Sequence, residues 1–345
     1  MAGTDIFCTT REQVGWVPIH HMIRLAAQAF DARIINFRRH RISRMARVRT
    51  ALTGAPRSGA DVAICILRSP QEIDRMLRSE VMTIPYRIRV LWIIDSFRTH
   101  HLPPAWQLKS FDVIAYCQRY DQEEYESRFG DRALFLGWGS DALNLGSAGP
   151  ERAFDILRIG RQPPAWDDDG ITTQKATAQG LVFQGRPPDI PDLSQQQPVL
   201  LRDYYGQSRF VIAHSNLAAP ESYTHKSKEY ITARWTDALA SGAVVAGVPP
   251  HSDLGLIDWP GALLPFDRID LDANLAQLAA ARAAWTPQMA LDNHLGALKQ
   301  LDWRWRFHTL SKHIGLRPAA LDAEIDRLNS RIAALTATQE PLSAS

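Results

Sequence analysis

One short stretch of the chain, residues 226–247, combines residue types that suit an anionic ligand. It reads KSKEYITARWTDALASGAVVAG. Thr232 precedes a short helical pattern and is a preferred type of N-cap residue, so the N–H groups of the first helical turn would form an anion site. Lys228 and Arg234 add positive charge beside that turn. The stretch therefore predicts the binding of a phosphate group.

Two acidic residues flank the predicted phosphate position. Glu229 and Asp237 stand eight residues apart, and carboxylates accept hydrogen bonds from sugar hydroxyl groups. The small residues of ALASG (238–242) let the helix lie close to the strand that follows, AVVAG. Taken alone, each acid is equally well explained as a solvated surface residue. Together with the helix of small residues, they favour a ligand made of a sugar, a phosphate and a ribose.

The rest of the chain has alternating strand and helix patterns, which favour parallel sheets with helices on their faces. A helix is predicted at 17–30, and a Gly-, Ser- and Pro-containing linker at 144–153 separates two series of strands. Strands of the first series are predicted at 5–8, 32–37, 61–67, 89–95, 112–117 and 133–138. Strands of the second are predicted at 154–160, 180–185, 208–214, 243–247 and 262–266. From residue 272 the pattern is helical, with one uninterrupted stretch over 288–314.

Residues at the ends of these strands are the first candidates for binding. Ligands of open α/β sheets bind beyond the carboxyl ends of the strands, and two such domains are expected to share a cleft. Arg161 follows a strand-ending glycine, and His214 ends another strand. Arg186 also follows such a glycine. The alternative for both arginines is an exposed side chain that binds no ligand. The alternative for His214 is a structural role in which its ring is hydrogen-bonded within the protein.

The segment EYITARWTDALASGAVVAG resembles the nucleotide-sugar-binding segment of GT-B glycosyltransferases of families 1 and 4, in which two acids with seven residues between them lead into an Ala-x-Ala-x-Gly turn. The resemblance implies an α/β fold of two Rossmann-like domains facing across a cleft (GT-B), with C-terminal helices. It implies a UDP- or GDP-linked sugar as donor substrate. Carried onto this chain, it implies that Glu229 lies by the donor sugar, Arg234 by the diphosphate and Asp237 by the ribose.

Two further likenesses refine the expected donor site. The segment RIGRQPP at 158–164 is similar to the Gly-Arg after the first strand of the family's donor domain, which favours Arg161 over Arg186. The EYIT part, with Tyr230, looks like the donor motif of the α-1,3-fucosyltransferases. This chain differs from that motif in having Ala-Arg, ending at Arg234, where those enzymes have Glu-Lys.

The acceptor side offers three candidates for a catalytic base. His20 and His21 lie where the first strand is joined to the first helix, and Asp95 ends a long buried strand. An inverting transfer needs a base for the acceptor proton, a retaining one needs none in that place, and the sequence leaves both open. Packing of the histidines and turn capping by Asp95 are the alternatives.

No Asp-x-Asp metal motif ends a strand, so we expect a reaction without metal or cofactor. Cationic side chains and a helix N-terminus would then stabilise the departing diphosphate.

Composition places the chain among ordinary globular proteins. It has 39 Lys and Arg residues against 37 Asp and Glu residues, and 45% of its residues are hydrophobic. Neither a signal peptide nor an apolar run of membrane-spanning length is recognisable, so a cytoplasmic protein is expected. Cys8, Cys65 and Cys117 are far apart and match no zinc or disulfide pattern, so buried free thiols are expected.

Residues 33–57 contain eight arginines and no acid. Such a run suits peripheral contact with an anionic membrane at its inner face, and a solvated helix face is the equal alternative. Aromatic residues are not interleaved with the arginines, which argues against nucleic acid. The final helix has an apolar stripe over 321–335, which indicates either docking on the body of the protein or a homodimer.

The sequence thus predicts an N-terminal acceptor domain at 1–145 and a donor-binding domain at 146–300. C-terminal helices at 301–336 partly cross back, and 337–345 form a flexible tail. The predicted activity is that of a hexosyltransferase acting on a glycan, a lipid-linked acceptor or a small molecule. A nucleotide-sugar epimerase and a non-catalytic sugar-nucleotide-binding protein are the alternatives.

Overall fold

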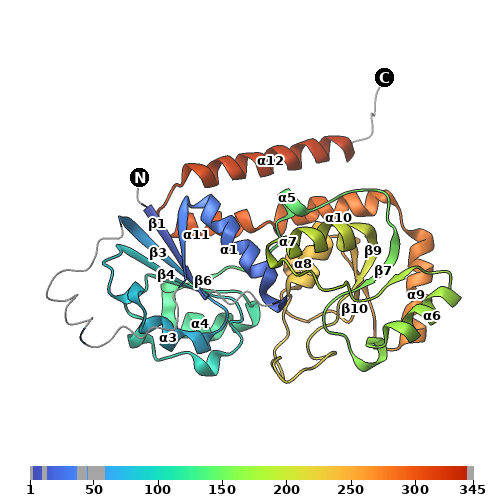
Figure 1. Ribbon diagram of the computed structural model, residues 1–345, viewed down its shortest axis with the longest axis horizontal. Coiled ribbons are helices and arrows are strands. Elements are labelled where there is room, and N and C mark those ends of the chain that lie inside the picture. The colour runs from blue at the N-terminus through green and yellow to red at the C-terminus, as the bar shows by residue number, and fades with distance from the viewer. Residues whose placement is uncertain (1–2, 10–13, 37–44, 46–58, 340–345) are drawn as a thin grey trace. The chain divides into compact units, whose positions relative to one another are not determined.

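The computed structural model describes residues 3–9, 14–36, 45 and 59–339 and forms two compact units (Figure 1). Unit 1 comprises the chain up to Gly137 together with Arg306–Glu324, and unit 2 comprises Trp138–Trp305 and the residues from Ile325 onward. The first boundary therefore falls at residue 137, not at 145. Residues 139 and 140 belong to unit 2 because Thr236 Oγ1 donates to the carbonyl of Gly139 at 2.8 Å and Ser140 Oγ donates to Asp237 at 2.6 Å.

Unit 1 contains a six-stranded sheet in the order β2-β1-β3-β4-β5-β6, in which every pair is parallel. The six strands of the first predicted series are confirmed. They are β1 (Gly3–Cys8), β2 (Ala32–Asn36), β3 (Ala60–Leu67), β4 (Ile88–Ile93), β5 (Val113–Tyr116) and β6 (Ala133–Phe135).

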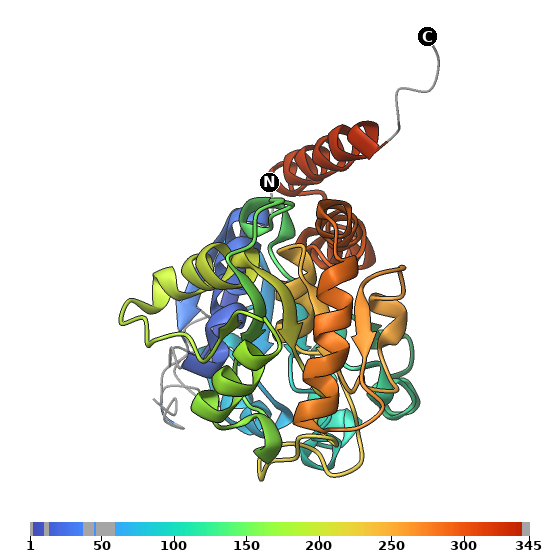
Figure 2. The same cartoon turned by 90° about the vertical axis from the view of Figure 1, so that its right-hand side faces the viewer.

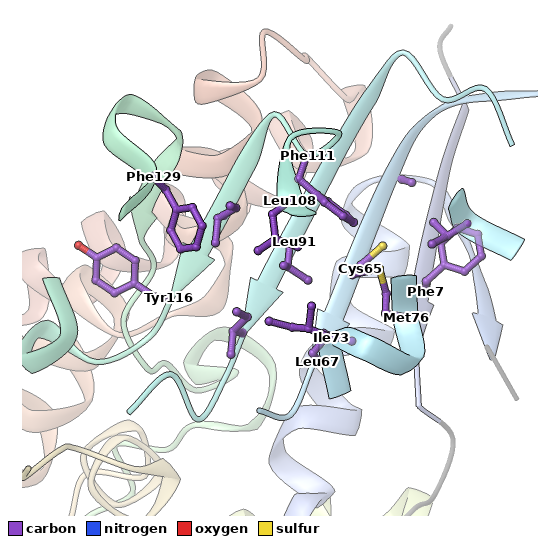
Figure 3. Close-up of a cluster of buried hydrophobic side chains, with 14 of the residues drawn as sticks. Phe7, Cys65, Leu67, Ile73, Met76, Leu91, Leu108, Phe111, Tyr116 and Phe129 are labelled. Atoms are coloured by element: carbon purple, nitrogen blue, oxygen red, sulfur yellow. The ribbon is translucent and has the colours of Figure 1, made fainter. Parts of the chain in front are cut away.

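Helices cover both faces of this sheet. Phe7, Cys65 and Leu91 point from their strands to one face, where α3 (Ile73–Leu77) and α4 (Gln122–Phe129) close the core (Figure 3). Trp92 is the next residue along β4 and so points to the opposite face. There its ring meets that of Phe307 on α11 (Trp303–His313) at 6.3 Å between centroids. The predicted first helix is α1 (Val17–Ala29).

Unit 2 contains a five-stranded parallel sheet in the order β11-β10-β9-β7-β8. Its strands are β7 (Phe154–Arg158), β8 (Phe183–Gln184), β9 (Ser208–Ile212), β10 (Val244–Gly247) and β11 (Leu263–Pro265), which confirms the second predicted series. Its helices are α5 (Ala142–Leu145), α6 (Asp169–Ala178), α7 (Leu193–Val199), α8 (Ala233–Ala240), α9 (Leu271–Ala284) and α10 (Pro287–Gln300). Buried residues of β7, β9 and β10 pack against Ala176 of α6 and Leu275 of α9, the orange helix in the foreground of Figure 2.

The stretch predicted as one helix at 288–314 is divided into α10 and α11. The break falls at Leu301 and Asp302 because backbone groups there bond to residue Ser140, far away in the sequence. Ser140 donates its N–H to Leu301 at 2.9 Å and accepts from Trp303 at 3.0 Å. The last helix is α12 (Ala319–Gln339), and the first three positions of its predicted stripe, Leu321, Ile325 and Leu328, are buried within the chain.

Helix α8 runs into β10 without a loop because Gly242 makes the connection possible. Gly242 has a φ of 76°, its N–H donates to Leu239, and the N–H of Ala243 donates to Ala238 at 2.9 Å. This is the Schellman arrangement, which satisfies the last helical carbonyls and reverses the chain at once. At the far end of β10, a Cβ on Gly247 would lie 1.9 Å from the carbonyl oxygen of Ala213.

Gly247→Ala is therefore expected to destabilise the protein by about 3 kcal/mol. The new methyl group would collide with the backbone of Ala213, directly after β9, which cannot rotate away as a side chain could. Chemical unfolding would measure the change. Gly255→Ala is the matched control, since no atom lies within 4 Å of the Cβ built there; equal stability of the two variants would contradict the prediction.

The cysteines, the arginine-rich stretch and the lengths of the helices can be compared with what the sequence predicts. The three cysteines are confirmed as buried and free. Of the eight arginines, Arg33 lies on β2 and pairs with buried Asp5, its Nε donating at 2.9 Å. Arg38, Arg39, Arg41, Arg44, Arg47, Arg49 and Arg57 lie outside the described residues. Within the part of the chain that the structure describes, every helix is too short or too polar to traverse a bilayer.

Candidate functional site

The strand order of unit 2 has a reversal point between β7 and β9. The chain leaves β7 towards β8 on one side and returns to β9 on the other. Loops on the two sides of such a point diverge at the carboxyl ends of the strands, and the space between them is where α/β sheets bind ligands. The loops after β7, β9 and β10 thus define the candidate donor site of unit 2.

Two arginines meet at this edge. Gly160, at a φ of 64°, brings the loop after β7 against Arg234, whose Cδ would lie 3.3 Å from a Cβ there. Arg234 Nη1 donates to the carbonyl of Arg161 at 2.7 Å. Burial, and then the charge of Arg161, lower the pKa of Arg234 to about 10, so its guanidinium group remains charged at neutral pH. Two like charges held together in a partly buried place favour an anion between them.

A buried histidine adds a neutral donor. His214 is 1% exposed, and its Nδ1 accepts from the N–H of Val248 at 3.1 Å, so the proton of the neutral ring is on Nε2. No described residue is a hydrogen-bond partner of that Nε2. Burial, and then the charge of Arg234, lower the pKa of His214 to about 3. The ring therefore stays neutral at physiological pH and offers one N–H.

Two further polar groups, a hydroxyl and an amide oxygen, also lack partners in the described part of the chain. Thr232 is the N-cap of α8 by its backbone conformation, but its hydroxyl does not cap the helix. Thr232 Oγ1 and Gln162 Oε1 are buried and lack a hydrogen-bond partner in the described ranges. Buried polar atoms without partners are uncommon in folded proteins. A ligand with both donors and acceptors would satisfy them; Gln162 was not among the residues predicted from the sequence.

The two predicted acids already accept hydrogen bonds from the protein. Asp237 is 3% exposed and accepts from Ser140 Oγ at 2.6 Å and Gln197 Nε2 at 2.9 Å. A contact of Asp237 with ribose would require exchanging one of these bonds. Glu229 accepts from Ser215 Oγ at 2.6 Å and from the N–H of His251 at 3.0 Å. Burial alone would raise the pKa of Glu229, but these hydrogen bonds outweigh it and lower the pKa.

Two other predicted donor-site residues lie on the same segment. Lys228 and Tyr230 are each 8% exposed. The carbonyl of Lys228 accepts from Asn216 Nδ2 at 2.7 Å, which ties this segment to the loop after β9. Asn216 and His251 were missed by sequence reasoning because they belong to no motif, whereas Ser215 was expected only as a residue at a strand end.

In unit 1, Asp95 follows β4 by two residues and is only partly buried. Its backbone N–H donates to Arg68 at 2.7 Å, whereas its carboxylate accepts no hydrogen bond from the residues that the structure describes. Burial raises the pKa of Asp95 to about 7, against the opposing charges of Arg98 and Arg68. A carboxylate with these properties is suited to take a proton near neutral pH.

His20 and His21 are half-buried on α1. His20 borders a cavity of about 10 Å³ together with Trp16 and Arg68. That volume holds no more than one water molecule. His20 thus lies near the end of β3, where Ile66 also lines the cavity.

A larger pocket opens on unit 1, lined by α3 and by the loops after β3 and β4. Its volume is about 380 Å³, within the usual range for ligand pockets. Gln71 Nε2 lies 2.8 Å from His101 Nε2, and Arg98 Nη1 donates to Gln71 Oε1 at 3.2 Å. The lining residues are Pro70, Gln71, Ile73, Asp74, Leu77, His101, Pro103 and Gln107. None of them was predicted, because they are brought together only by the loops after β3 and β4.

The same architecture occurs in solved structures of glycosyltransferases. HepE from Anabaena, in complex with UDP and glucose, matches with a TM-score of 0.57 at 10% identity, over 91% of this chain and 99% of its own. A glycosyltransferase from Rickettsia africae matches with a TM-score of 0.54 at 10% identity, over 90% and 98% of the two chains. The fold is GT-B.

A sucrose-phosphate synthase from Thermosynechococcus elongatus has this GT-B fold too, with a TM-score of 0.51 at 12% identity over 90% of this chain and 98% of its own. No protein-family model and no curated protein sequence matches the chain. The GT-B assignment therefore depends on the architecture of the two units.

Proposed function

We propose that this protein is a glycosyltransferase that moves a sugar from a nucleotide-diphosphate sugar to an acceptor hydroxyl group without a metal ion. The observation that supports this most strongly is the pair Arg161 and Arg234 beside the unsatisfied Nε2 of His214, at the reversal point of unit 2. A pyrophosphate is the part of such a donor that two guanidinium groups and a helix N-terminus bind best.

The same groups would also assist the reaction. When the bond between the sugar and the diphosphate breaks, negative charge develops on the diphosphate oxygen. Arg234, Arg161 and the first N–H groups of α8 would stabilise that charge, and the neutral His214 would add a hydrogen bond. HepE was crystallised with UDP and with UDP-glucose, which makes UDP the first nucleotide to test here.

Asp95 is the proposed base for the acceptor hydroxyl. Its carboxylate has no hydrogen-bond donor among the described side chains to compete for its lone pairs, and its pKa near 7 leaves it partly ionised at neutral pH. We further propose that the pocket lined by α3 and the loops after β3 and β4 binds a neutral saccharide as acceptor. The pocket has amide, imidazole and carboxylate groups for hydroxyls, and its proline and aliphatic walls suit sugar C–H faces.

The other proposals concern partners and location. Peripheral contact with an anionic membrane would use residues 33–57, most of which lie outside the described residues. Homodimer formation would use the C-terminal part of α12, where Ile332 and Leu335 are only half-buried. A cytoplasmic location agrees with the expected nucleotide-sugar substrate.

Donor binding is tested by thermal shift with UDP-, GDP-, dTDP- and CMP-sugars. We expect at least one nucleoside diphosphate sugar to stabilise the fold, by about 2.7 kcal/mol at a concentration one hundred times its Kd. We also expect that EDTA will not reduce this shift, because guanidinium groups supply the positive charge.

Turnover separates the proposed enzyme from its alternatives. Release of free nucleoside diphosphate that depends on a saccharide acceptor supports transfer. Interconversion of donor sugars without release would indicate an epimerase, and binding without either would indicate a non-catalytic protein. The absence of any stabilising nucleotide would refute the proposed function itself.

A further inference from the structure

A chain of hydrogen bonds joins three segments of unit 2 and ends at an open imidazole. Ser215 Oγ donates to Glu229 Oε1 at 2.6 Å, and the other oxygen of Glu229 lies 2.5 Å from His251 Nδ1. The Glu229 side chain is 8% exposed, whereas that of His251 is 94% exposed. An ionised carboxylate can only accept, so Nδ1 carries a proton and Nε2 is the ring atom that remains for a ligand.

This chain of hydrogen bonds lies at the same edge of the sheet as the arginine pair. Ser215 follows β9, His251 follows β10, and Glu229 precedes the N-cap of α8 by three residues. The loops after β9 and β10 are tied together, because Ser215 donates its N–H to Val248 at 2.8 Å and Val248 donates its N–H to His214. The imidazole is therefore attached to the loops that carry the proposed diphosphate site.

The position of Glu229 changes what it can do for a ligand. Both of its oxygens already accept hydrogen bonds from protein groups. Its pKa is lowered, so the carboxylate stays ionised and accepts the Nδ1–H of the imidazole beside it. The pair then presents the ring nitrogen Nε2 to a ligand, whereas Glu229 alone would have presented a negative charge to an anionic substrate.

We propose that His251, oriented by Glu229, binds the diphosphate of the nucleotide-sugar donor through Nε2 as an imidazolium and takes up a proton when a nucleoside diphosphate binds. In the reaction it offsets the charge that develops on the departing diphosphate. This inference rests on the proposed function and assigns a role to a residue that the sequence motif does not include.

Other charges near these hydrogen bonds would either favour or oppose a positive charge on the His251 ring. A phosphate next to Nε2 and the carboxylate of Glu229 both favour the charged ring, and cations oppose it. The remaining charged or titratable side chains on the loops after β9 and β10 and at the start of α8 are Glu221, Tyr223, His225, Lys226, Lys228, Tyr230, Arg234, Asp253 and Asp258. Because Lys228 and Arg234 are cationic, uptake is expected to be a fraction of one proton at pH 8, not a full one.

Calorimetric titration of UDP, and separately of GDP, tests the proposal. Titrations at pH 8 in HEPES and in Tris, whose ionisation enthalpies differ, give the number of protons taken up per nucleotide bound. We expect measurable uptake in the wild-type protein and none with uridine, which has no phosphate. Uptake by the nucleotide itself is separated from uptake by the protein through the variants.

Two isosteric variants separate the ring nitrogens. His251→Asn keeps a donor near Glu229 but removes Nε2, and His251→Gln places a neutral amide nitrogen near the position of Nε2. We expect both to lose the proton uptake and His251→Asn to bind UDP about 10- to 100-fold more weakly, with a smaller loss for His251→Gln. Glu229→Gln should reduce uptake with Nε2 still present. His313→Asn, at an exposed histidine of α11 in unit 1, is the control and should behave as wild type.

The possible failures are distinguishable. If UDP or GDP binds and proton uptake in His251→Asn equals that of the wild type, the inference about His251 is wrong and the proposed function stands. If UDP or GDP binds and the wild-type protein takes up no proton, the inference about His251 is also wrong and the proposed function stands. If neither nucleotide binds at any tested concentration, the donor site itself is wrong.

Discussion

Asp95→Asn is expected to slow sugar transfer by about 10²- to 10⁴-fold, the usual contribution of a general base, while donor binding stays at the wild-type level. The amide has nearly the same shape as the carboxylate but cannot accept the acceptor's proton. Initial rates with saturating donor, together with calorimetric donor affinity, measure the two effects separately. A variant that keeps more than half of the wild-type rate would exclude Asp95 as the base of an inverting reaction.

The pH dependence gives a second, independent measurement. A base must be ionised, so the kcat/KM of the wild-type enzyme should rise with pH through about 7, the pKa of Asp95. This rise should be missing from the residual activity of Asp95→Asn.

The stability of the wild-type protein should fall as pH rises, whereas its kcat/KM should increase. Burial raises the pKa of Asp95 above that of the unfolded chain, so the folded state keeps a proton that the unfolded state loses between about pH 4 and pH 7. The wild-type protein therefore loses stability as pH rises through this window. Asp95→Asn, which cannot ionise, should gain stability relative to the wild type between pH 5 and pH 8. Chemical unfolding at these two pH values provides the comparison, and a variant destabilised equally at both would indicate a structural role for Asp95.

Arg234→Ala is expected to weaken binding of the nucleoside diphosphate by about 10- to 100-fold and to slow transfer by about 10²- to 10³-fold. The substitution removes a partly buried charge and the hydrogen bond that holds the Arg161 carbonyl at 2.7 Å. The rate should fall more than the affinity because the charge on the diphosphate grows as the sugar departs. Calorimetry with UDP and single-turnover kinetics would separate these two effects.

Two further arginine variants test whether position or charge matters. Arg186→Ala changes an arginine that also follows a strand-ending glycine but whose side chain is 63% exposed, and it should bind UDP as the wild type does. Arg234→Lys keeps the charge and loses the forked geometry of the guanidinium group, so an intermediate loss is expected. If Arg186→Ala weakens binding as much as Arg234→Ala, the observed effect reflects overall charge and not a built diphosphate site.

Local pattern was sufficient to predict the strands and their order in the chain. Parallel strands are buried on both faces, so each appears as an apolar run, such as DVAICIL in β3 or SRFVIAH around β9. The turn from α8 to β10 was also readable, because a helix can enter a strand directly only where small residues and Gly242 permit it. The grouping of Arg161, His214 and Arg234 follows from the same rule, since parallel strands bring their carboxyl ends to one edge.

The sequence alone did not determine which partner each polar side chain would have. Glu229 and Asp237 have the spacing of ligand-binding acids, yet Ser140, Gln197, Ser215 and His251 approach them from distant segments and occupy their oxygens. The break between α10 and α11 likewise depends on Ser140, which is far away along the chain. Periodicity and propensity report on neighbours within one element, whereas hydrogen-bond partners and pKa shifts arise between elements. For that reason the fold could be predicted from the sequence, but the proton on His251 and the raised pKa of Asp95 could be inferred only from the tertiary structure.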